Sequence, residues 1–75
     1  MCGIISYCGN RQAIPILIDG LKRLEYRGYD SAGLSTVDKN KMITIKTVGK
    51  VSQLENKTAG TRINSSFGIA HTRWA

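Results

Sequence analysis

The first ten residues, Met-Cys-Gly-Ile-Ile-Ser-Tyr-Cys-Gly-Asn (residues 1–10), place a thiol directly in front of a short apolar run that ends at a Gly-Asn turn signal. A run of this length followed by a turn is typical of a buried strand, so we expect a strand over residues 4–8. Small side chains next to an initiator Met generally permit its removal. We therefore expect Cys2 to become the first residue, with a thiol and a free α-amino group on one Cα.

A cysteine with a free α-amino group is a candidate nucleophile, because the amine can act as the base that removes the thiol proton. The ordinary pKa is about 7.7–8.0 for an α-amino group and about 8.5 for a thiol, so this transfer costs little near neutral pH. Taken alone, Met1-Cys2 more often marks a small structural cysteine. The choice between the two interpretations depends on motifs further along the chain.

The chain has 75 residues and a formal net charge of +6, from 11 Lys and Arg against 5 Asp and Glu. This length allows at most one small domain with a marginal core. Residues 67–75 resemble a strand that is cut short, so we expect the N-terminal piece of a longer protein. The basic residues are dispersed and form no run with interleaved aromatics, which argues against nucleic-acid binding.

Cys2 and Cys8 are expected to lie in one strand, about 20 Å apart at 3.3 Å per residue. A disulfide requires Cα atoms within about 7 Å, so these two cysteines should not pair with each other. Their spacing with the lone His71 suggests no metal site, and we expect Cys8 to be a small buried residue. No signal peptide or membrane-spanning run is apparent, so we expect a cytoplasmic protein without membrane contact.

The hydrophobic pattern predicts a layered α+β domain. Apolar residues recur at helical spacing from residue 14 to residue 24, with Pro15 in the first turn and Gly28 as the terminator. Residues 32–37 and 42–48 flank a polar connection at 38–41, which predicts a β-hairpin with a half-buried second strand. A short helix around Val51 and Leu54, a loop at 58–66 and a strand at 67–72 complete the expected order.

Two further strings carry chemistry. Residues 24–33, Leu-Glu-Tyr-Arg-Gly-Tyr-Asp-Ser-Ala-Gly, pack charged, aromatic and glycine residues between the helix and the hairpin. Residues 71–74, His-Thr-Arg-Trp, end the last strand with a guanidinium and an indole. These two groups are suited to line a pocket for a small anion.

Together, the N-terminal string, LEYRGYDSAG and GIAHTRWA resemble the class II glutamine amidotransferases, and within them the isomerizing glutamine:fructose-6-phosphate aminotransferases. The resemblance spans residues 1–75 and is least specific between residues 38 and 66. It implies the start of a four-layer αββα N-terminal-nucleophile hydrolase fold. It also implies that the rest of this glutaminase domain and the sugar isomerase domains lie outside the sequence.

The resemblance assigns roles where residues match the family motifs. Cys2 would be the catalytic nucleophile that hydrolyses glutamine, Arg73 and Trp74 would bind the substrate, and Arg27 and Gly28 would support the loop beside Cys2. The full-length enzyme would pass the ammonia to fructose 6-phosphate, form a homo-oligomer, and need neither metal nor organic cofactor. The oxyanion-hole residues would lie beyond Ala75, so the 75-residue piece alone is expected to be inactive.

Three alternatives stay open at this point. One is that the chain starts another class II enzyme such as an amidophosphoribosyltransferase, and another is that it is a small basic binding module in which Cys2 is structural. A third alternative concerns mechanism: His71 would be the base of a Cys-His dyad, in place of the amine.

Overall fold

The computed structural model of the chain describes residues 2–24 and 31–73. Four strands and two helices follow one another in the order expected from the sequence: β1 (Gly3–Cys8), α1 (Ala13–Leu24), β2 (Ser31–Asp38), β3 (Lys41–Val48), α2 (Val51–Ala59) and β4 (Phe67–Arg73). The α+β class is therefore confirmed.

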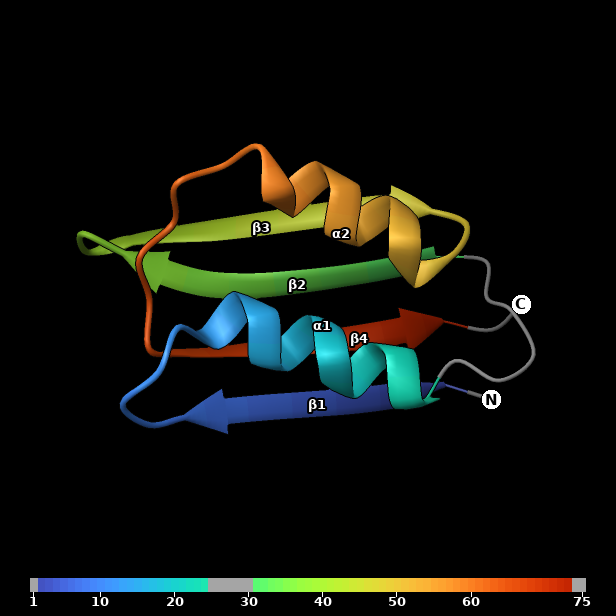
Figure 1. Ribbon diagram of the computed structural model, residues 1–75, viewed down its shortest axis with the longest axis horizontal. Helices are drawn as coiled ribbons and strands as arrows, with labels where there is room; N and C mark the ends of the chain where they lie inside the picture. The colour runs from blue at the N-terminus through green and yellow to red at the C-terminus, as the bar shows by residue number, and fades with distance from the viewer. Residues whose placement is uncertain (1, 25–30, 74–75) are drawn as a thin grey trace.

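The strands form one antiparallel sheet in the order β1-β4-β2-β3. Both helices lie on the same face of this sheet, with α1 along β1 and β4 and α2 along β3 and β2 (Figure 1). β4, which comes last in the sequence, is inserted between β1 and β2. As a result, the end of β4 lies beside the beginning of β1.

The core lies between the helices and the inner face of the sheet. The helical stripe expected from the sequence is confirmed, since Leu17, Ile18 and Leu21 of α1 are buried. The other buried apolar side chains come from α1, both inner strands and α2: Ala13, Ala32, Leu34, Val51, Leu54 and Ala70. Burial of this apolar surface is the main force that holds the helical layer on the sheet.

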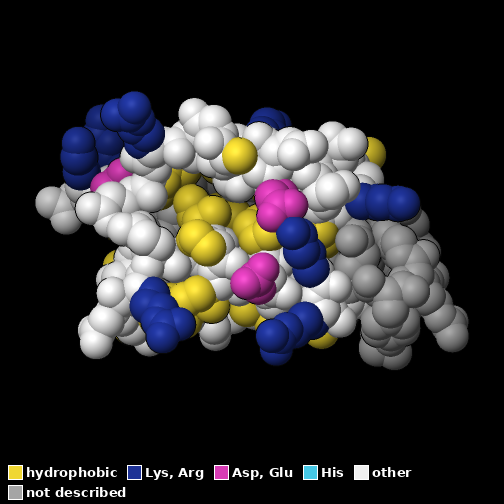
Figure 2. Space-filling view, viewed as in Figure 1, with side chains coloured by type: hydrophobic (Ala, Val, Ile, Leu, Met, Phe, Trp, Pro, Cys, Tyr) yellow, Lys and Arg dark blue, Asp and Glu magenta, His cyan; other side chains and the backbone are white. Residues whose placement is uncertain are grey.

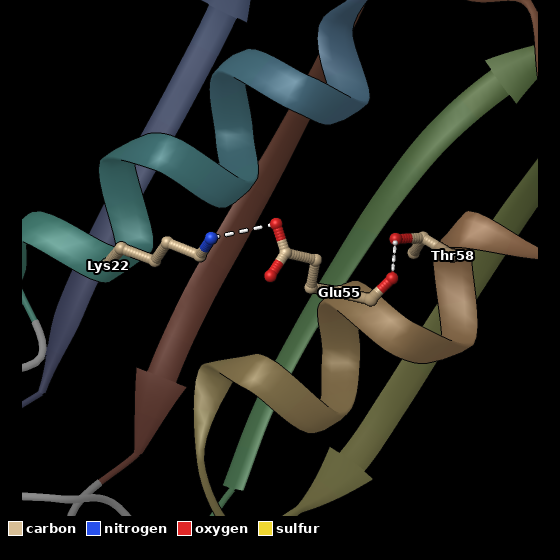
Figure 3. Close-up of polar contacts among 3 residues, drawn as sticks. All are labelled: Lys22, Glu55 and Thr58. Carbon is tan, nitrogen blue, oxygen red and sulfur yellow. Dashed lines mark hydrogen bonds and ion pairs between the residues drawn. The ribbon is translucent and has the colours of Figure 1, made fainter.

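The two helices are also joined by an ion pair. Lys22 Nζ on α1 donates to Glu55 Oε2 on α2 at 2.7 Å, and Thr58 Oγ1 donates to the Glu55 carbonyl at 3.0 Å (Figure 3). The hydrogen bond to Glu55 raises the pKa of the Lys22 ammonium above its ordinary value. Both side chains of the pair are about half exposed, so we expect its contribution to stability to be small.

A hollow of about 370 Å³ lies beside this ion pair, between the two helices. Figure 2 shows apolar side chains inside it and acidic side chains at its margin, while Lys and Arg are scattered around the rim of this face. The dispersed pattern of basic residues expected from the sequence is thus seen on this face.

The connection from α2 to β4 is anchored on the start of α1. Gln12 Nε2 donates to Asn64 Oδ1 at 2.7 Å, and the Ala13 amide donates to the Ser65 carbonyl at 2.7 Å. The Thr36 hydroxyl of β2 donates to the Phe67 carbonyl at 2.7 Å. These bonds guide the chain into the centre of the sheet, where β4 must begin.

The hairpin between β2 and β3 has a two-residue turn. Lys39 and Asn40 both have positive φ, 53° and 65°, as a type I′ turn requires. Burial alternates along β3, so the expected half-buried second strand is confirmed.

Two expectations about burial were wrong. β1 is an edge strand, and side chains on one of its faces are exposed, including Ile4 at 77% and also Cys8. The apolar run looks like a buried strand, but within the described residues helices cover only one face of the sheet.

The expected loop also begins later, because α2 continues through Ala59. Gly28, the expected helix terminator, lies outside the described residues.

Close packing of α1 on the sheet depends on Gly68. A Cβ at this position would lie 2.7 Å from the Ser35 carbonyl oxygen and 3.1 Å from Leu17 Cδ1. Because the first of these atoms belongs to the backbone, it cannot move aside cheaply.

We predict that Gly68→Ala lowers the free energy of unfolding by about 1–3 kcal/mol, as overpacking of a core does. Gly60→Ala is the matched control, because a Cβ there meets no atom within 4 Å. The control should stay within about 0.5 kcal/mol of the parent protein. Denaturant titration measures both values, and equal stability of the two variants would contradict the packing argument.

Candidate active site

The face of the sheet opposite the helices, called here the outer face, is rich in exposed apolar side chains. Side chains alternate between the two faces along each strand. The large exposed apolar residues of the described chain all fall on the outer face: Ile4, Met42, Val48, Phe67 and Ile69. Two hollows of about 390 and 320 Å³ lie over strands of this sheet.

Cys2 lies immediately before β1, at one end of the outer face. Gly3 pairs with Thr72, so continuing the register by one residue places Cys2 opposite Arg73. Position 3 faces the helices, so by alternation the neighbouring position, Cys2, faces outward. Arg73 also faces outward, and both residues are exposed. Directly opposite residues have Cβ atoms about 4.5–5.5 Å apart, so the sheet brings the expected nucleophile and the expected anion-binding residue together.

Arg73 is the last residue of β4, and it is paired with Ser31 of β2. Backbone pairing of a central strand restrains the position of the Arg73 Cα far better than a loop would. The guanidinium can therefore offer its fork of N–H donors to a carboxylate near Cys2.

His71 lies one step further from Cys2 on the same face. It pairs with Ile4 in β1 and with Gly33 in β2. The position of Cys2 is diagonal to it, and diagonal neighbours in a sheet are about 7–8 Å apart. His71 is thus near Cys2 without being its direct partner, and the dyad alternative keeps a geometric basis.

Three of the residues expected at the site lie outside the described residues, namely Arg27, Gly28 and Trp74. Cys8 is placed at the other end of β1, where it pairs with Phe67. Both Cys2 and Cys8 are free thiols, in agreement with the expectation that they do not form a disulfide with each other.

Thr72 was not singled out from the sequence, and it lies directly behind the site on the inner face of the sheet. Its side chain is 1% exposed, and its hydroxyl has no hydrogen-bond partner among the described residues. Its position between the candidate residues His71 and Arg73 was the sequence feature that could have identified it.

Across residues 2–24 and 31–73, no three His, Cys, Asp or Glu side chains gather into a group that could hold a metal ion. In the same part of the chain, neither helix is long and apolar enough to cross a membrane.

No protein-family model matches the chain. Individual proteins do match it along its whole length. The glutamine–fructose-6-phosphate aminotransferase (isomerizing) of Bacteroides thetaiotaomicron is 59% identical over 76 residues. Proteins of the same name from Pseudomonas aeruginosa and Gloeobacter violaceus are 54% and 53% identical over 76 residues. Each match covers 100% of this chain and 12% of the relative.

The chain is a homologue of the N-terminal segment of the glutamine–fructose-6-phosphate aminotransferases. The resemblance inferred from the motifs is confirmed. The chain spans about one eighth of the length of these aminotransferases, as the coverage of 12% shows.

The juxtaposition of Cys2 and Arg73 can be tested by cross-linking. We predict that Arg73→Cys, made in a Cys8→Ser background, forms a disulfide with Cys2 on mild oxidation. Directly opposite residues have Cα atoms about 4.5–5.5 Å apart, within the range that a disulfide spans. Mass spectrometry of the linked peptides measures it.

Ile69→Cys in the same background is the control. Residue 69 is four positions along β4, about 13 Å from residue 73, so it should remain a free thiol. Cross-linking of Ile69→Cys to Cys2, or its absence in Arg73→Cys, would show that the register is different.

Proposed function

We propose that this chain is the beginning of a class II glutaminase domain in which Cys2, exposed by removal of Met1, hydrolyses the side-chain amide of glutamine. The observation that supports this proposal is the antiparallel pairing of Gly3 with Thr72, which, continued by one residue, sets Cys2 opposite Arg73. The relatives, whose names contain glutamine and fructose 6-phosphate, support it over the whole chain.

The α-amino group of Cys2 would take the thiol proton as Sγ attacks the amide carbon of glutamine. The C–N bond then breaks, the proton passes to the leaving nitrogen, and ammonia departs from a γ-glutamyl thioester. Water, deprotonated by the same amine, attacks the thioester and releases glutamate and the free thiol. A nucleophile at the start of a paired strand is held in position for both steps.

Arg73 would bind the α-carboxylate of glutamine through two parallel N–H···O bonds, an arrangement for which guanidinium is suited. Trp74 would line the same pocket. Arg27 and Gly28 would steady the loop beside Cys2. The scheme uses no metal ion and no organic cofactor.

The outer face suggests how the domain continues. A sheet with one face covered by helices and the other rich in exposed apolar residues is half of a layered structure. We infer that a second sheet, from later residues, packs on Ile4, Phe67, Ile69 and their neighbours. Cys2 and Arg73 would then lie at the edge of the space between two sheets, as in the four-layer αββα N-terminal-nucleophile fold.

In the full-length protein, the ammonia would convert fructose 6-phosphate to glucosamine 6-phosphate on sugar isomerase domains that follow. We propose a cytoplasmic homo-oligomer for that enzyme. An amidophosphoribosyltransferase is not favoured, because the relatives described above all carry the aminotransferase name. A basic binding module would instead retain Met1 and bind nucleic acid with strong salt dependence.

We predict that a glutamine-analogue electrophile such as diazo-oxo-norleucine adds once to the full-length protein, at Cys2. Only a thiol beside a base and an α-carboxylate site should react quickly. Intact mass and peptide mapping locate the adduct and show whether Met1 is gone.

Cys8→Ala is the control, and it should be labelled as fast as the parent because Cys8 lies at the far end of β1. Labelling at Cys8, or absence of labelling with Met1 retained, would refute the proposed nucleophile.

Replacement of His71 separates the amine from the dyad alternative. We predict that His71→Gln forms the thioester at a rate within about tenfold of the parent, because the base is the amine; loss of a general base typically costs about 10²–10⁴-fold. Single-turnover release of ammonia measures this rate. A loss of that larger size, with the melting temperature unchanged, would establish His71 as the base.

A further inference from the structure

Two threonine hydroxyls of the described residues are buried without a hydrogen-bond partner. They are Thr47 Oγ1 on β3 and Thr72 Oγ1 on β4. Buried polar groups are nearly always paired, so each exception calls for an explanation. The two differ in place: Thr47 lies on an edge strand far from Cys2 in the sheet order, whereas Thr72 lies directly opposite Gly3.

The Thr72 hydroxyl adjoins the backbone of β1. A Cβ on Gly3 would lie 3.3 Å from Thr72 Oγ1 and 2.7 Å from Leu24 Cδ1. Because Gly3 has no side chain, no atom of a residue-3 side chain separates the buried Thr72 hydroxyl from the backbone of β1. Gly3 is next to Cys2 in the chain. The neighbour of Thr72 on the other side, Ala32, is small and apolar and offers no side-chain partner.

Removal of Met1 would create a hydrogen-bond partner for this hydroxyl, namely the α-amino group of Cys2. In the unprocessed chain the nitrogen of Cys2 is an amide with one hydrogen and no basic lone pair. After removal of Met1 it becomes an amine with two hydrogens and a basic lone pair, no longer held in a peptide plane. We propose that Thr72 Oγ1 then accepts a hydrogen bond from this amine.

This bond would aim the lone pair of the amine. Alternation along β1 places the Cys2 side chain on the outer face, whereas Thr72 is on the inner face. An amine that donates a hydrogen toward the inner face presents its lone pair toward the other side, where Sγ lies. Thr72 is thus a positioning residue for the base. This inference rests on the proposed glutaminase function.

The bond also has a consequence for the amine pKa. A hydroxyl oxygen accepts a stronger hydrogen bond from a charged ammonium than from a neutral amine, so it favours the protonated form. Removing the hydroxyl should lower the amine pKa and shift the acid limb of the pH–rate profile to lower pH. The same removal should lower kcat, because the lone pair is no longer directed.

The test compares Thr72→Val, Thr72→Ser and Thr47→Val in the full-length enzyme. We expect Thr72→Val to reduce kcat for glutamine hydrolysis by about tenfold or more, with KM for glutamine within twofold and the acid limb moved to lower pH. Thr72→Ser keeps the hydroxyl and should retain the parent profile. Thr47→Val should also retain it, since that hydroxyl is far from Cys2.

The inference is overturned if Thr72→Val keeps the parent kcat and acid limb, or if Thr47→Val changes them equally. Should valine prevent folding, Thr72→Ala against Thr72→Ser makes the same comparison, because only serine retains the hydroxyl. Intact mass confirms removal of Met1 in every variant. The Cys2→Ala variant distinguishes the two hypotheses. If Cys2→Ala still hydrolyses glutamine, the proposed function fails. If Cys2→Ala is inactive and Thr72→Val has the parent activity, only the Thr72 inference fails.

Discussion

The antiparallel pairing of β1 with β4 is the constraint on which the rest of this structure depends. It joins the first strand to the last one described, so residues up to 69 positions apart become neighbours. Loop closure over such a distance costs entropy, and the cost is recovered by burying Leu17, Leu21 and their neighbours against the sheet. The hydrogen bonds from Gln12, Ala13 and Thr36 to residues 64–67 help to direct β4 into its place between β1 and β2.

The same pairing divides the residues of one short string between two faces. Thr72 points toward the helices, while His71 and Arg73 point to the outer face. In the proposed function the outer Arg73 binds the substrate carboxylate, and in the proposed positioning role the inner Thr72 accepts a hydrogen bond from the Cys2 amine. One face of β4 thus carries the candidate site residues and the other packs against the core, and a Cβ on Gly3 would lie 3.3 Å from Thr72 Oγ1.

Much of the local structure was predictable from the sequence. The helical spacing of Leu17, Ile18 and Leu21 identified the buried face of α1, and the polar connection at 38–41 identified the hairpin. Burial was harder to predict, as Ile4 and Cys8 show, because an apolar strand looks the same whether one or both of its faces are covered. The motifs named Cys2 and Arg73 as site residues, but only through resemblance to a family.

The sequence by itself determined the kinds of element, their order and the identity of the reactive groups, since these follow from local periodicity, turn residues and side-chain chemistry. Only the tertiary structure decided the register of β1 on β4, which continued by one residue sets Cys2 opposite Arg73, and the burial of the Thr72 hydroxyl beside Gly3. Strand order and register arise from contacts between distant segments. No local pattern records them, because the free energy that selects them comes from how the helices and the whole sheet pack together.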